Sequence, residues 1–226
     1  VHSPRDRQVH PQQLTLALLD AARQQGAQMC FDAEVLSIDE KNGRACATLA
    51  SEERHEADWL VLTAGLGTTA LASSATIDIR PVLGQAVEVA MASPLEPDEF
   101  RPVVTGNDIH VVQLTISQST SEQSPPESRY WVGATVEFPR DGDEAAIEAE
   151  LQTMWAGAIA LHPTLASATI LRIWWGKRPR PFNRPAPIIE RLPGYSRVII
   201  ASGHYRNGVL LAPATAQKVT ELLQED

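Results

Sequence analysis

The sequence has few cysteines, and their spacing argues against two common uses of this residue. Cys30 and Cys46 are the two cysteines among 226 residues. They are too few for a disulfide scaffold and lack the paired spacing of a zinc site, although one structural bridge between them stays open. This usage is typical of a reducing compartment, so the sequence predicts a cytoplasmic protein without a metal.

Long apolar runs and an excess of positive charge are also missing. The longest apolar stretches, Trp59-Leu60-Val61-Leu62 and Val198-Ile199-Ile200-Ala201, are far shorter than the roughly 20 residues of a membrane helix. Nineteen lysines and arginines against 28 aspartates and glutamates give a net charge of -9. Because nucleic-acid binding needs a basic surface, we expect neither a membrane nor a nucleic acid as partner.

The chain is 43% hydrophobic, which is enough for a folded domain. Its N-terminal part shows an α/β pattern. The spacing predicts a helix over 11–25, a strand over 29–39, and a hairpin that turns at Asn42-Gly43. A continuously apolar strand over 57–63 then runs into Ala64-Gly65-Leu66-Gly67. This last segment is not a full Gly-x-Gly-x-x-Gly turn.

The middle of the chain changes to strand patterns separated by turns over 77–138, which predicts a largely antiparallel sheet. An amphipathic helix over 143–161 and a strand over 167–176 follow. A proline-rich arm, a short buried strand over 196–202 and a helix started by Pro213 return to an α/β pattern. The predicted fold class is therefore mixed α/β, with boundaries that place one part at 1–76 and 185–226 and an inserted part at 77–184.

Three segments carry residues suited to chemistry. The loop that begins at Gly203 could aim backbone N–H groups and a helix N-terminus at an anion, or be an ordinary strand-to-helix turn. Arg178, after Trp174-Trp175, could bind a carboxylate with its planar guanidinium inside an apolar wall, or the tryptophans could be core. His110, with Asp108 on the same strand face, could be catalytic or structural.

Six segments resemble, in order, those of the glycine oxidase and D-amino-acid oxidase family of flavoproteins. They are Val9-His10-Pro11-Gln12-Gln13-Leu14, the strand ending in Ala64-Gly65, Arg80-Pro81-Val82-Leu83-Gly84-Gln85, Val132-Gly133-Ala134-Thr135-Val136-Glu137, Gly176-Lys177-Arg178-Pro179, and Gly203-His204-Tyr205-Arg206-Asn207-Gly208 through Pro213. The resemblance implies part of an FAD-binding doubly wound domain with an inserted antiparallel substrate domain.

By this resemblance, Arg178 would hold a substrate carboxylate, with His110 and Arg206 as further catalytic candidates. FAD would contact Val35 and the Ala64-Gly65 turn. The rest of its predicted site is the loop and helix start made by Gly203, His204, Tyr205, Arg206, Asn207, Gly208, Val209 and Leu210. The helix dipole there would stabilise negative charge on the reduced flavin.

The family's N-terminal Gly-x-Gly-x-x-Gly segment is not found among these 226 residues. We therefore expect a C-terminal portion of such an enzyme, which binds FAD weakly or not at all by itself and pairs with the missing segment or with a second copy. His110 stands where glycine oxidase-like members often carry tyrosine, and Asn183-Arg184 replaces the usual Asp-Gly, so the substrate stays open.

The predicted function is oxidation of a small amino acid or amine to an imine, with hydride transfer to FAD and formation of peroxide. Electron transfer to an acceptor other than oxygen is a variant of this hypothesis. A non-catalytic interaction domain derived from such a flavoenzyme is the first alternative. The second is a carboxylate-binding module that uses Arg178 without redox chemistry.

Overall fold

The chain folds into two compact units, Val1–Arg80 with Pro179–Asp226, and Pro81–Arg178. The computed structural model describes residues 7–72, 77–91, 102–114, 128–139 and 146–225. The functional domains predicted at 1–76 with 185–226 and at 77–184 stay a prediction, but the mixed α/β fold class is confirmed.

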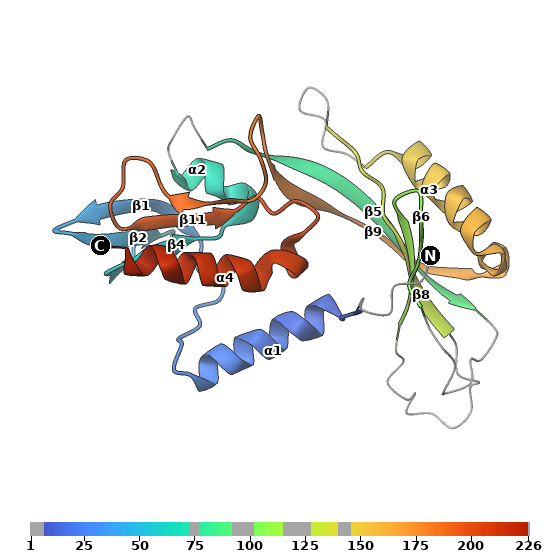
Figure 1. Cartoon of the computed structure of the whole chain (residues 1–226), viewed down its shortest axis with the longest axis horizontal. Helices are drawn as coiled ribbons and strands as arrows, with labels where there is room; N and C mark the ends of the chain where they lie inside the picture. The colour runs from blue at the N-terminus through green and yellow to red at the C-terminus, as the bar shows by residue number, and fades with distance from the viewer. Residues whose placement is uncertain (1–6, 73–76, 92–101, 115–127, 140–145, 226) are drawn as a thin grey trace. The chain divides into compact units, whose positions relative to one another are not determined.

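Two small sheets and several helices form the first unit (Figure 1). One sheet is antiparallel, with strands β1 (Val35–Lys41), β2 (Arg44–Leu49) and β3 (Arg54–Ala57). The other has the order β10 (Ile188–Arg191), β11 (Val198–Ser202) and β4 (Leu60–Leu62), in which β11 and β4 are parallel. The helices are α1 (Pro11–Gln24), the 3-10 turn Gly65–Gly67, α2 (Thr68–Ala72) and α4 (Gly208–Gln224).

Local sequence explains the elements that position the first unit's candidate residues. Asn42 and Gly43 both adopt positive φ at the β1–β2 turn, as the hairpin signal predicted. Every residue of β11 is buried, and Val198 and Ile200 pack with Ile38 and Leu62 in one core. Helix α1 matches its predicted range, yet none of its residues is buried.

The second unit is a five-stranded sheet covered on one face by a helix (Figure 1). The strand order is β6 (Val104–Gly106), β7 (Ile109–Gln113), β8 (Ser128–Gly133), β5 (Ile79–Met91) and β9 (Thr169–Pro181). The β6–β7, β7–β8 and β8–β5 pairs are antiparallel, which confirms the predicted arrangement. Helix α3 (Glu148–Leu161) and the following 3-10 turn Pro163–Ser167 complete the unit.

Strand alternation divides the sheet of the second unit into a buried and an open face. Val87 and Val89 of β5 are buried against the core that Met154 and Ala158 of α3 share. The alternate residues Gly84, Ala86 and Glu88 face the other way and are half-buried. The open face is therefore the one that can receive a ligand.

Several predicted boundaries were wrong. The strand expected over 29–39 begins only at Val35, and Phe31 is exposed. Strands β3 and β10 were missed, and β9 continues into the proline-rich arm as far as Pro181. The Asp143 and Glu144 part of the predicted helix over 143–161 lies outside the described residues.

The last helix begins at Gly208, five residues before the predicted start at Pro213. The apolar run after Gly208 continues the helical turn. Pro213 is then accommodated inside it with the loss of one backbone hydrogen bond. Residues 208–210 therefore belong to the first helical turn and not to the loop, which places the helix N-terminus closer to Gly203.

None of the helices in the described part of the chain is long and apolar enough to cross a membrane. Cys30 is exposed and Cys46 is buried, and both are free thiols. The bridge left open by the sequence is therefore absent from this structure. The Cys46 sulfur instead accepts hydrogen bonds from Arg54 Nε and Nη2, at 3.3 and 3.2 Å.

Candidate functional site

A row of small residues crosses the open face of the second unit. The strand register places His110 of β7 opposite Gly133 of β8, and Gly133 opposite Ala86 of β5. Directly opposed residues of antiparallel strands share a face. The row therefore leaves backbone and short side chains at the centre of the face, beside the longer side chain of His110.

Arg178 of β9 lies on the same open face with its guanidinium held against β5. Nη1 donates to the carbonyl oxygens of Leu83, at 2.9 Å, and of Thr135, at 3.1 Å. A Cβ atom built at Gly84 would overlap the guanidinium carbon and both of its terminal nitrogens. The cation thus rests on the backbone of Gly84 and has a fixed orientation.

Behind this arginine is a buried carboxylate that the sequence interpretation missed. Glu137 is 5% exposed and accepts hydrogen bonds from Gln85 Nε2, at 2.9 Å, from the Ile147 N–H, at 2.8 Å, and from the Thr135 hydroxyl. Burial alone would raise the pKa of Glu137, but these hydrogen bonds and the charge of Arg178 together hold it below its ordinary value. The carboxylate is therefore ionised and ties helix α3 to the sheet.

Of the two tryptophans predicted to form a wall around Arg178, only Trp174 lies on its face of the sheet, because successive strand residues point to opposite faces. Trp174 lies on the open face, where its ring meets Trp131 edge-on at 5.9 Å between centroids. The guanidinium above Trp174, at 4.7 Å, is that of Arg172. Trp175 points the other way and is half-exposed.

His110 is half-buried on β7, and its Nδ1 lies 3.0 Å from the hydroxyl of Thr105. The expected partner, Asp108, lies outside the strand. It occupies the β6–β7 turn, where it adopts a positive φ and is exposed. Turn geometry thus removes Asp108 from the face on which strand periodicity had placed it.

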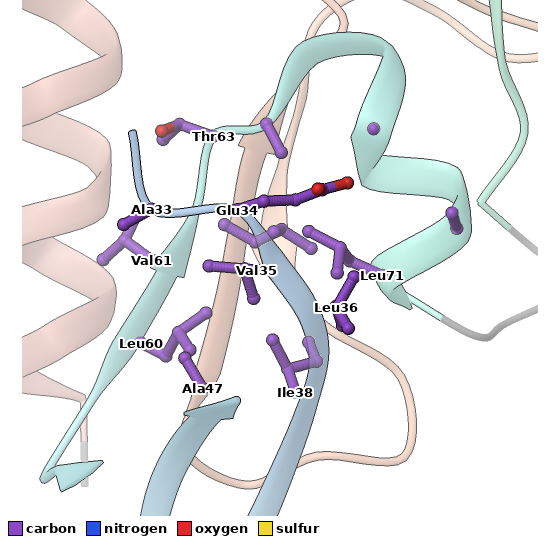
Figure 2. A pocket seen from close by; sticks show the side chains of 14 residues that line it. Ala33, Glu34, Val35, Leu36, Ile38, Ala47, Leu60, Val61, Thr63 and Leu71 are labelled. Carbon is purple, nitrogen blue, oxygen red and sulfur yellow. The ribbon is translucent and has the colours of Figure 1, made fainter. Parts of the chain in front are cut away.

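The first unit contains a hollow of about 630 Å³ beside β4, into which two predicted FAD residues open (Figure 2). Val35, at the start of β1, and Ala64, after β4, both line it. The remaining lining is mostly apolar and includes Leu60, Val61 and Leu71, with Glu34 as its charged residue. Val61 is 38% exposed, so β4 is less buried than its sequence predicted.

The loop before α4 reaches its conformation through two residues in the left-handed region. Gly203 has φ +73°, and a Cβ atom there would also lie 2.8 Å from Pro181 Cγ, so glycine is required on both counts. Tyr205 has φ +55°, and its N–H donates to the Pro179 carbonyl at 2.9 Å. Arg206 is exposed.

A buried hydroxyl pair links this loop to the turn after β4. Thr68 Oγ1 donates to Ser202 Oγ at 3.0 Å, and Ser202 Oγ donates to the Gly65 carbonyl at 3.4 Å. Both hydroxyls are nearly inaccessible to solvent. The structure therefore brings the predicted Gly65 and Gly203 segments together through two residues for which the sequence suggested no role.

His204 makes its contact with helix α4, since its Nε2 lies 2.8 Å from the hydroxyl of Thr215. Burial lowers the pKa of this imidazole below the ordinary 6.5, which favours the neutral ring at pH 7. We expect an NMR titration of His204 to give a midpoint below 6.5. Native stability should fall as the pH drops from about 6.5 through the lower native pKa of His204, because the unfolded imidazole takes up its proton first. A midpoint at or above 6.5 would contradict the burial argument.

The predicted site residues thus form two groups. Arg178 and His110 share the open face of the second unit. In the first unit, Val35 and Ala64 share one hollow, while the Gly65 turn meets the segment that begins at Gly203. Their roles in catalysis and FAD binding stay predictions.

Sequence comparison identifies relatives over nearly the whole chain. The chain is 31% identical over 224 residues to the bifunctional protein ThiO/ThiG of Synechocystis sp., covering 97% of this chain and 31% of that protein. It is 30% identical over 221 residues to glycine oxidase of Bacillus licheniformis, covering 96% of this chain and 55% of the relative. The chain therefore spans about a third to about half of the length of these relatives.

Solved structures show the same fold. Iminodiacetate oxidase from Chelativorans sp. BNC1 aligns with a TM-score of 0.75 and 21% identity, over 95% of this chain and 55% of that protein. Glycine oxidase from Geobacillus kaustophilus aligns with a TM-score of 0.73 and 24% identity, over 94% of this chain and 54% of that protein. The family described as "DAO: FAD dependent oxidoreductase" matches residues 1–222. The predicted resemblance is therefore confirmed, and the chain belongs to the DAO family of FAD-dependent oxidoreductases.

Proposed function

We propose that this chain supplies the carboxylate-binding face and part of the FAD site of an oxidase that acts on a small amino acid. The observation that carries the proposal is the guanidinium of Arg178, fixed by the carbonyls of Leu83 and Thr135 on an open sheet face. An arginine held in this way can bind a carboxylate through two parallel N–H groups. The names of two relatives, glycine oxidase and iminodiacetate oxidase, support an amine that carries a carboxylate.

Within this site, the chain's own residues bind and orient the substrate. Arg178 would hold the carboxylate and so fix the direction of the amine-bearing carbon. The row formed by Ala86 and Gly133 offers little bulk, which suits a small substrate, and His110 borders the row. The chemistry that FAD supplies when bound is acceptance of a hydride from the amine-bearing carbon, with reoxidation by oxygen to give hydrogen peroxide.

Two features of the first unit fit the ring systems of FAD. The mostly apolar hollow beside Val35 and Ala64 suits a flat aromatic ring. At the start of α4, Asn207 makes no side-chain capping hydrogen bond, and the first N–H groups of a helix have no partner within it. That helix end, which carries partial positive charge, suits the oxygen-bearing edge of a flavin.

The test is reduction of the flavin by matched amines. In an FAD-loaded enzyme that joins this chain to the family's Gly-x-Gly-x-x-Gly segment, glycine should bleach the visible bands of oxidised flavin without oxygen, and readmitted oxygen should restore them with release of peroxide. Methylamine has no carboxylate and should react far more slowly, by about a hundredfold or more in kcat/KM. Equal rates with glycine and methylamine would contradict the carboxylate assignment. Flavin that no amino acid reduces would contradict the oxidase assignment.

A further inference from the structure

Gly84 lies on β5, and its backbone conformation does not by itself require glycine. Its φ lies outside the left-handed region that favours glycine. What the site requires is space, because a Cβ atom at residue 84 would overlap Nη1, Nη2 and Cζ of Arg178. The strand therefore presents bare backbone where the guanidinium lies.

The hydrogen bonds of Arg178 make this contact specific. One acceptor is the carbonyl of Leu83, the residue directly before Gly84, and the other is the carbonyl of Thr135. Thr135 is joined in turn to Gln85, on the other side of Gly84. The Thr135 N–H donates to the Gln85 carbonyl at 3.1 Å, and the Gln85 N–H donates to the Thr135 hydroxyl oxygen at 2.8 Å. Both acceptors are thus anchored to the strand on which the guanidinium rests.

The other glycines that the structure describes in this unit do not lie against Arg178 in this way. At Gly176, two residues before Arg178 on β9, a Cβ atom would meet nothing within 4 Å. At Gly133, it would meet Ala86 Cβ at 2.9 Å and Ala86 Cα at 3.5 Å. Glycine is therefore required at position 133 because neighbouring strands pack closely there. At position 84 it is required because Arg178 occupies the space of a side chain.

We propose that Gly84 is a positioning residue for the substrate carboxylate, which it affects by letting the guanidinium of Arg178 lie directly on strand β5. The proposal rests on the proposed function of Arg178. A methyl group at residue 84 would move the guanidinium, which is the far end of a flexible side chain, and leave the sheet in place. Carboxylate binding should therefore suffer much more than folding.

The experiment measures glycolate binding to the full chain by calorimetry in the wild type, Gly84→Ala, Gly176→Ala, Arg178→Ala and the Gly84→Ala/Arg178→Ala double variant. Glycolate carries the carboxylate of a small amino acid, and its neutral amide is the control ligand. We expect Gly84→Ala to weaken glycolate binding by about tenfold or more, and Gly176→Ala by less than about twofold. The melting temperature of Gly84→Ala should stay close to that of the wild type.

The double variant separates positioning from a general structural effect. If Gly84 acts through Arg178, Gly84→Ala should have no further effect once Arg178 is alanine. Wild-type affinity in Gly84→Ala, or a further loss in the double variant, would overturn the proposal and leave the role of Arg178 intact. If wild type and Arg178→Ala bind glycolate equally, or if neither binds it, the proposed function of Arg178 fails instead.

Discussion

Replacing Arg178 with alanine should lower kcat/KM for an amino-acid substrate by about a hundredfold or more, because a charge-assisted pair with the carboxylate is lost. The loss should appear mainly as a higher KM if the pair is equally strong in the ground and transition states. Arg178→Lys should recover only part of the activity. It keeps the charge beside Glu137 but lacks the planar pair of donors that a carboxylate accepts. Steady-state peroxide formation by the FAD-loaded enzyme that joins this chain to the Gly-x-Gly-x-x-Gly segment measures both variants.

Lys177→Ala provides the matched control for this prediction. Lys177 is the adjacent cation on β9, is exposed, and points to the opposite face of the strand. Its removal changes the net charge by the same amount and should alter kcat/KM by less than about twofold. Equal losses in Arg178→Ala and Lys177→Ala would show that general charge, and not a fixed guanidinium, attracts the substrate.

Patterns that depend on local backbone preferences were read correctly from the sequence. Asn42-Gly43 predicted the β1–β2 turn, and the apolar spacing predicted helices α1 and α3. Local signals failed where tertiary context decides. The polar strand β3 is formed by pairing with β2, and no apolar alternation marks it in the sequence.

In the candidate site too, sequence motifs identify some residues, whereas the roles of others depend on contacts that form only in the folded structure. Arg178 was first singled out from its guanidinium chemistry beside two tryptophans, and the resemblance of its segment to a family motif then assigned it the substrate carboxylate. Gly84 lay within another such segment, but its meaning depends on a contact 94 positions along the chain. Glu137 reads in the sequence as one more acidic residue in a strand. Its importance comes from the donors that folding places around it, which are Gln85, Thr135 and the Ile147 N–H.

Glu137→Ala should lower the free energy of unfolding of the second unit by about 3 kcal/mol or more, because three donors would lose their acceptor in a buried site. The donors come from both the sheet and the start of α3, so the loss should weaken their packing together. Chemical denaturation followed by tryptophan fluorescence reports mainly on this unit, which holds four of the chain's five tryptophans. Glu148→Ala removes an exposed carboxylate from the first turn of α3 and should cost less than about 0.5 kcal/mol.

Acid should weaken the wild type through the same carboxylate. Since the pKa of native Glu137 lies below the ordinary 4.5, the unfolded chain takes up this proton first as the pH falls. The stabilisation is therefore complete well above pH 4.5 and is lost as the pH falls through the native pKa. Glu137→Gln cannot ionise, so the stability difference between wild type and this variant should shrink over that range. A difference that stays constant with pH would mean that the shape of Glu137, and not its charge, holds α3 to the sheet.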